Sequence, residues 1–165
     1  MEIRRATPAD AAEICAIYND HVVATIVSFE TEAVGTLEMA ARVREGLLHH
    51  DWLVGVHEGR VVGYAYYGPF RARAAYRHTV EATIYLAEAV QGQGFGKGLY
   101  GALIASARAK GYRELVGVIA LPNPASTALH RKLGFHEVGV LKNVGYKFGA
   151  YIDVGLCQLS LDKTR

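Results

Sequence analysis

Four glycines alternate with other residues between positions 92 and 98, in the sequence Gln-Gly-Gln-Gly-Phe-Gly-Lys-Gly that begins at Gln91. Glycines let backbone N–H groups approach a ligand without side-chain interference, and a helix that starts there adds the positive end of its dipole. The segment predicts a phosphate or pyrophosphate site. A turn that binds nothing is the alternative interpretation.

Two common nucleotide-binding loops do not fit this spacing. A Walker loop needs Gly-Lys followed by Ser or Thr, whereas Lys97 is followed by Gly98, so no hydroxyl is available for magnesium. A Rossmann loop needs G-x-G-x-x-G, and this segment alternates strictly. A nucleoside triphosphatase and a dinucleotide-binding enzyme are therefore disfavoured.

Glu81 is the only acidic residue in the apolar run from Thr79 to Ala87. Partial burial in such a run raises the pKa of a carboxyl group toward the range of a general base. A structural ion pair with Arg77 or His78 is the alternative, and the residues alone leave both interpretations open.

Basic side chains crowd the segment just before that run: Arg71, Arg73, Arg77 and His78. Guanidinium groups bind carboxylates and other small anions, so the cluster indicates a pocket for a small acid. A solvated connector is the alternative.

No metal site is expected. The sequence His49-His50-Asp51 lacks further nearby ligands and is typical of a polar helix end. Cys15 and Cys157 lie far apart in apolar surroundings, which predicts two buried free thiols.

Period and turn signals define the elements that must position these residues. Apolar residues recur at helical spacing in two early segments: Ala11, Ile14, Cys15, Tyr18 and Val22, then Leu37, Ala40, Val43, Leu47 and Leu48. The expected elements are a strand at 2–6, a helix capped by Thr7 and Asp10 that fades near Thr25, a helix capped by Thr36, a hairpin at 52–67, a strand at 79–86, a helix after the glycine loop that ends at Gly111, a strand at 115–120, a short helix at 123–133, and strands at 135–141 and 151–161. This order predicts a mixed α/β fold.

Length and composition predict one domain over residues 1–165. Hydrophobic residues make up 51% and charged residues 21%, which excludes a disordered chain. The net charge of +2 is too small for attraction to a polyanion to be the leading idea, so no nucleic-acid partner is expected. The absence of a long apolar run or leader-like start predicts a cytoplasmic protein with no membrane partner.

The glycine loop resembles the Q/R-x-x-G-x-G/A loop of the GCN5-related N-acetyltransferases (GNAT), which grips the pyrophosphate of acetyl-CoA. Four further blocks are similar to the phosphinothricin and methionine sulfone/sulfoximine acetyltransferase branch: SFETE at 28–32, YRHTVEATIYL at 76–86, ALHRKLGF at 128–135 and VGYKFG at 144–149. The resemblance covers essentially the whole chain. It implies a single-domain GNAT fold with a mixed, mostly antiparallel sheet flanked by helices, acetyl-CoA as co-substrate, and a homodimer.

The resemblance also implies the cofactor contacts. Backbone groups of Ile84 and Leu86, with Tyr85 between them, would pair with the pantetheine arm, and the Leu86 amide would stabilise the oxyanion. Asn123 would contact the same arm, or cap the helix that follows it, or both. The residues that would hold the pyrophosphate are Gln91, Gly92, Gln93, Gly94, Phe95, Gly96 and Lys97.

For the chemistry, the resemblance implies that Glu81 is the base that deprotonates the amine. His130, where many relatives have tyrosine, would be the acid that protonates the CoA thiolate; a histidine satisfied on a helix face is the alternative. The implied substrate residues are Phe29, Glu30, Arg71, Arg73, Tyr76, Glu81, Ala82 and Thr83.

The predicted function is acetylation of the α-amino group of a small amino-acid-like acid, of the phosphinothricin, methionine sulfoximine or methionine sulfone type, in detoxification. Acetylation of a protein N-terminus or another amine is one alternative, and a CoA-binding module without turnover is another. A polyamine substrate is disfavoured because the basic segment would repel it.

Overall fold

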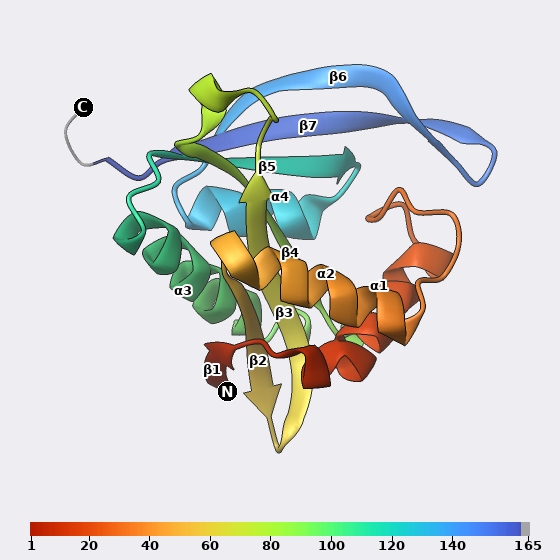
Figure 1. The fold of residues 1–165 in the computed structure, drawn as a ribbon. Helices are drawn as coiled ribbons and strands as arrows, with labels where there is room; N and C mark the ends of the chain where they lie inside the picture. The colour runs from red at the N-terminus through yellow and green to blue at the C-terminus, as the bar shows by residue number, and fades with distance from the viewer. Residues whose placement is uncertain (163–165) are drawn as a thin grey trace.

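The computed structural model describes residues 1–162, which form one α/β unit around a single sheet (Figure 1). Its 7 strands lie in the order β1-β2-β3-β4-β5-β7-β6. All neighbours are antiparallel except β4 and β5, which confirms the expected mixed, mostly antiparallel sheet. The last three residues of the predicted 1–165 domain lie outside the described residues.

The element order agrees with the sequence prediction. In chain order the elements are β1 (Glu2–Arg5), α1 (Ala11–Ala24), α2 (Thr36–His49), β2 (Trp52–His57), β3 (Arg60–Pro69), β4 (Thr79–Leu86), α3 (Phe95–Ala109), β5 (Glu114–Leu121), α4 (Pro124–Lys132), β6 (His136–Lys147) and β7 (Ala150–Ser160), with short 3-10 turns at Pro8–Asp10, Ala74–Tyr76 and Glu88–Val90.

Helices cover both faces of the sheet (Figure 1). One core packs α1 and α2 against one face of β2 and β3, and a second core packs α3 and α4 against the opposite face and β5. Cys15 lies in the first core and Cys157 in the second, both buried and free, as predicted. No helix among residues 1–162 is long and apolar enough to cross a membrane.

The start of the first helical segment confirms the predicted cap. The Asp10 carboxylate accepts hydrogen bonds from the Thr7 N–H (2.8 Å) and from Arg4 Nη2 (2.6 Å). These bonds, above all the one from Arg4, hold the pKa of Asp10 at about 2.

The predicted start and apolar face of α2 were wrong in part. Gly35 is the N-cap, and Thr36 is already helical and caps nothing with its side chain. Met39 and Val43 are the buried residues, whereas Leu37 and Leu48 are 89% and 70% exposed. At 100° per residue, these two leucines lie on the opposite side of the helix from Met39.

The final hairpin is longer than the expected strands at 135–141 and 151–161. The pairing of β6 with β7 shifts between Leu141↔Val154 and Gly145↔Ile152, so residues 142–144 form a bulge opposite Asp153. The bulge breaks the alternation on which the sequence prediction relied, and β6 continues beyond it.

Gly117 of β5 lies against the His130 side chain of α4. A Cβ at this position would lie 2.7 Å from Cys157 Sγ and 2.7 Å from His130 Nε2. By contrast, a Cβ at Gly101, within α3, would meet no heavy atom within 4 Å.

We therefore expect Gly117→Ala to lower the free energy of unfolding by about 1–3 kcal/mol through overpacking. The matched variant Gly101→Ala should raise it by up to about 1 kcal/mol, because alanine is the better helix former. Urea unfolding followed by circular dichroism measures both. Equal effects of the two substitutions would contradict the close packing of α4 on β5.

Candidate active site

The two central strands separate after a short parallel contact. β4 pairs with β5 from Thr79↔Glu114 to Ala82↔Gly117, whereas its pairing with β3 continues to Leu86. β5 meanwhile follows β7 as far as Leu121. A gap therefore opens between β4 and β5, with its vertex at Ala82 and Gly117.

The backbone groups that face this gap follow from the register. The Ala87 N–H donates to the Val62 carbonyl (2.9 Å), which places the odd-numbered residues of β4 in hydrogen bonds with β3. The amides and carbonyls of Ile84 and Leu86 therefore face the gap, whereas those of Tyr85 face β3. A ligand with alternating amide groups can pair with the free edge of β4 as an added strand does.

Two side chains support the far end of this edge. His21 Nε2 donates to the Leu86 carbonyl (3.1 Å), and Gln91 Nε2 donates to the same oxygen (3.3 Å). The other ring nitrogen of His21, Nδ1, is buried without a hydrogen-bond partner. His21 was not predicted from the sequence, because on α1 it reads as an ordinary polar residue of the last turn.

The glycine loop lies between β4 and α3, as predicted. Gly92 and Gly94 have φ angles of 75° and 85°, a region that favours glycine, and Gly94 is the N-cap of α3. The loop is exposed over residues 91–94, so the first N–H groups of the helix are open to an anion. A Cβ at Gly96 would lie 3.2 Å from Leu86 Cδ1, so this glycine lets α3 approach β4.

His130 of α4 lies at the vertex of the gap. Its Nδ1 donates to the Ser126 carbonyl (2.8 Å), and its Nε2 lies 3.1 Å from the Tyr100 hydroxyl. That hydroxyl is also 3.4 Å from the Ala82 carbonyl. Burial lowers the pKa of His130, which favours the neutral imidazole. Both ring nitrogens of His130 have hydrogen-bond partners, which fits a structural histidine on a helix face. The side chain also lies against Gly117, where the strands separate, which fits a role as the acid.

Tyr100 is a site residue that the sequence analysis missed. It is 0% exposed and lies on the buried side of α3, so it reads as core. A buried phenol needs a hydrogen-bond partner, and that requirement is the one signal that could have marked it.

Glu81 lies on the opposite face of the sheet from His130. It shares the α1–α2 face with Tyr85, whose ring packs edge-on against Tyr18 at 5.1 Å. Burial raises the pKa of Glu81, and the charge of Arg71 partly offsets this rise. Within residues 1–162, Glu81 forms no ion pair with Arg77 or His78, which removes the structural alternative; Arg77 instead donates to the Ala74 carbonyl (3.3 Å).

Phe70, also missed from the sequence, organises the basic segment. The Arg71 guanidinium lies 4.3 Å from the Phe70 ring centroid, and the Tyr76 ring meets Phe70 edge-on at 5.8 Å. Arg73 is exposed at the start of the short turn that holds Tyr76. The structure therefore groups two of the predicted substrate residues, Arg71 and Tyr76, around one aromatic ring.

The loop after α1 carries two further predicted substrate residues, Phe29 and Glu30, whereas the predicted Ala82 and Thr83 lie on β4 beside Glu81. Phe29 is 43% exposed, and its ring fills the space above Gly145, where a Cβ would lie 2.3 Å from Phe29 Cζ. Glu30 is held by Arg42 of α2 (2.7 Å).

At the far side of the gap, Asn123 Oδ1 accepts from the Ser126 N–H (3.0 Å). This bond confirms the capping role of Asn123 and leaves its NH₂ group for a ligand.

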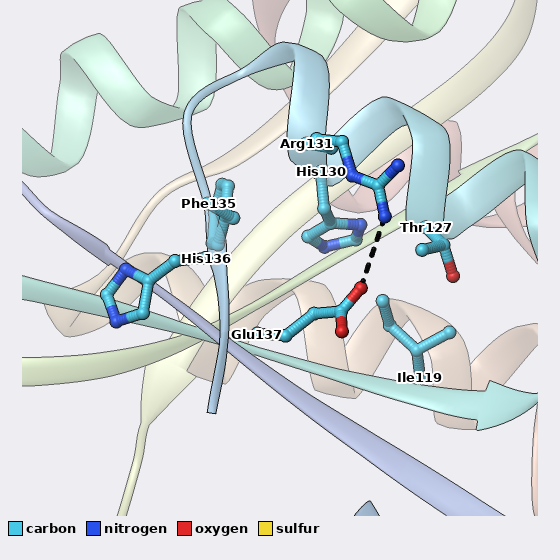
Figure 2. A pocket seen from close by; sticks show the side chains of 7 residues that line it. All are labelled: Ile119, Thr127, His130, Arg131, Phe135, His136 and Glu137. Carbon is cyan, nitrogen blue, oxygen red and sulfur yellow. Dashed lines mark hydrogen bonds and ion pairs between the residues drawn. The ribbon is translucent and has the colours of Figure 1, made fainter. Parts of the chain in front are cut away.

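Two surface cavities flank these groups. A cavity of about 250 Å³ lies beside His130, between α4 and the start of β6, and the Arg131–Glu137 ion pair (3.3 Å) crosses it (Figure 2). It is lined by Ile119, Thr127, His130, Arg131, Phe135, His136 and Glu137. A second, of about 310 Å³, lies between α2 and β3 and contains Tyr64 and Tyr66. Neither contains Glu81 or the glycine loop.

Comparison with known proteins agrees with this geometry. A family model described as an acetyltransferase (GNAT) domain matches residues 3–156. A phosphinothricin N-acetyltransferase of Streptomyces viridochromogenes is 42% identical over 158 residues, 96% of this chain and 86% of that protein. An L-methionine sulfoximine/L-methionine sulfone acetyltransferase of Pseudomonas aeruginosa is 40% identical over 167 residues, 99% of this chain and 96% of that protein.

A solved structure shows the same fold. The crystal structure of a GNAT superfamily phosphinothricin acetyltransferase from Sinorhizobium meliloti, in complex with acetyl-CoA, matches with a TM-score of 0.95 at 36% identity, covering 98% of this chain and 89% of that one. The chain therefore belongs to the GNAT acetyltransferase family, and acetyl-CoA is its co-substrate.

Proposed function

We propose that this enzyme transfers the acetyl group of acetyl-CoA to the α-amino group of a small amino-acid-like acid, of the phosphinothricin, methionine sulfoximine or methionine sulfone type. One observation carries the proposal. Glu81 is a half-buried carboxylate with no hydrogen bond or ion pair to any residue in 1–162, and it lies next to the vertex of the gap with the charge of Arg71 nearby.

The chain's own groups would hold the co-substrate along the gap. The backbone of Ile84 and Leu86 pairs with the pantetheine arm, and the Asn123 amide reaches it from the start of α4. The open N–H groups of the glycine loop, together with Lys97, bind the pyrophosphate. Tyr85 would take part through its side chain on the α1–α2 face, because its backbone groups already pair with β3.

Glu81 would act as the base, because an alkylammonium must lose a proton before it attacks the thioester. The Leu86 N–H stabilises the oxyanion that forms. His130 is neutral at rest, so it first takes up a proton from solvent at Nε2. It then acts as the acid: the Nε2 proton passes to the Tyr100 oxygen while the Tyr100 hydroxyl proton passes to the departing thiolate. Arg71, Arg73 and Tyr76 bind the acid group of the acceptor, and Phe29 and Glu30 cover it.

Thiol release with a panel of acceptors tests the function. Phosphinothricin, methionine sulfoximine and methionine sulfone should each release CoA thiol, and their N-acetylated forms should not. Turnover with an N-terminal peptide alone would favour the protein-acetylating alternative. Binding of acetyl-CoA without turnover on any amine would leave a CoA-binding module.

We expect Glu81→Gln to lower kcat by about 10²–10⁴-fold, because the amide cannot accept a proton. The KM for acetyl-CoA should stay within about twofold, since Glu81 does not contact the cofactor edge of β4. In the wild type, kcat/KM should fall as the pH drops through the pKa of Glu81, which burial places above its usual 4.5. Unchanged turnover in Glu81→Gln would show that Glu81 is not the base. The same fall of kcat/KM at low pH in Glu81→Gln as in the wild type would show this too.

The relay predicts that His130 and Tyr100 act as one unit. His130→Gln and Tyr100→Phe should each lower kcat by about 10²-fold, and the double variant should be no worse than about threefold below either single variant. Steady-state kinetics on the three variants, with thermal unfolding as the control for folding, make the test. Multiplicative losses would show that the two side chains act separately.

We also propose a homodimer that buries the outer part of the β6–β7 hairpin. Tyr146, Phe148 and Tyr151 are 62%, 62% and 71% exposed there, a large apolar area for a free surface. Light scattering at micromolar concentration should give the mass of a dimer, and Tyr146→Ser with Tyr151→Ser should shift it toward the monomer. A monomeric wild type would contradict the assembly.

We place the enzyme in the cytoplasm, because both its cysteines are free and buried, as in proteins of reducing compartments. Acetylation there would detoxify amino-acid analogues whose free amine is needed for their action.

A further inference from the structure

Lys147 is a buried cation to which the proposed chemistry gives no task. It lies on β6 next to the hairpin turn, is 4% exposed, and forms no ion pair with a residue in 1–162. Its Nζ donates to the carbonyls of Thr25 (2.8 Å) and Ser28 (2.7 Å). Burial lowers the pKa of this ammonium group, which shows the cost of keeping it out of water.

The two carbonyls belong to the loop that carries Phe29. Thr25 is the C-cap of α1, where a helix has unpaired carbonyls and the negative end of its dipole, so a cation is favoured there. Ser28 is tied on its other side, because its hydroxyl shares a hydrogen bond with the Tyr18 hydroxyl (2.8 Å). The Tyr18 ring in turn packs against Tyr85 of β4.

The loop therefore has one anchor beside β4 and another on β6. In the sheet order, β5 and β7 lie between these two strands, so a loop tied to both crosses the open side of the β4–β5 gap. In Figure 1 the segment after α1 rises toward the tip of the blue β6–β7 hairpin. The contact of Phe29 with Gly145 is on the same side of the hairpin as Lys147.

The bulge in β6 helps to aim Lys147 at the loop. Asp153 holds the bulge closed, since its carboxylate accepts from Lys142 Nζ (2.8 Å) and from the Asn143 N–H (2.9 Å). A bulge bends its strand, and here the part that bends carries Gly145 and Lys147.

We propose that Lys147 is a positioning residue that holds loop 25–32 across the acceptor side of the gap, and thereby fixes Phe29 over the bound acceptor. An ammonium group suits this task because its hydrogen bonds are complete only while both loop carbonyls are in place; the Phe148 ring, 5.0 Å from Nζ, faces the charge but belongs to the hairpin and not to the loop. The identity of the acceptor rests on the proposed function, but the holding of the loop does not.

Lys147→Met, which keeps most of the unbranched side chain and removes the charge and the donor, tests the proposal. Amide exchange of loop 25–32 should become at least about tenfold faster, while α2 is unchanged. The KM for the acceptor should rise about tenfold, because the closed loop becomes a minor state, with the KM for acetyl-CoA within about twofold. Lys132→Met, at the exposed end of α4, is the matched control and should change neither quantity.

A second variant, Lys147→Gln, keeps a donor with a shorter reach and should lie between the wild type and Lys147→Met in both measurements. Unchanged loop exchange in both folded variants would overturn the proposal, and so would faster exchange with an unchanged acceptor KM. If the wild type acetylates no amine, the proposed function fails, and loop exchange alone decides whether Lys147 holds the loop.

Discussion

The separation of β4 from β5 is the constraint on which the rest of the structure depends. Buried backbone groups need hydrogen-bond partners, and a central strand that loses its neighbour exposes an edge that another chain of amides can occupy. The fold keeps this edge open beyond Ala82 and Gly117 and closes every other strand pair around it. The groups that we propose for catalysis and cofactor binding are arranged with respect to this vertex.

Charge is placed locally in this molecule. The net charge of +2 is too small to attract a nucleotide strongly, which fits our proposal that backbone N–H groups and one helix end bind the cofactor phosphates. Glu30 is neutralised by Arg42, whereas the charge of Lys147 is stabilised by two carbonyl dipoles and the face of the Phe148 ring. Glu81 is left without a hydrogen-bonded partner in residues 1–162, which is the condition under which a carboxylate can serve as a base near neutral pH.

Local signals in the sequence were sufficient for most of the fold. Short-range chemistry marks several element ends, and the structure confirms them: Thr7 with Asp10, the glycines at 92 and 94, and Asn123 before Pro124.

The gap itself could not be predicted from composition or hydrophobic period, because it depends on where two strands far apart in sequence stop pairing. Tyr100 and Lys147 were missed for the same reason, because each has its role through a contact with a residue far away in the sequence. Phe70 contacts the nearby Arg71 and Tyr76, but by type it reads as an ordinary apolar residue. Leu37 and Leu48 show the opposite error. They were predicted to face the core because they are apolar, but they lie on the exposed side of α2.

The central claim is that acetyl-CoA pairs with the free edge of β4, and the amide protons of Ile84 and Leu86 test it most directly. In ¹⁵N-labelled protein, titration with acetyl-CoA should shift these two amide resonances downfield and slow their exchange with solvent, while Tyr85, already bonded to β3, changes little in exchange. Slower exchange confined to the β6–β7 hairpin, with Ile84 and Leu86 unchanged at saturating acetyl-CoA, would contradict the account.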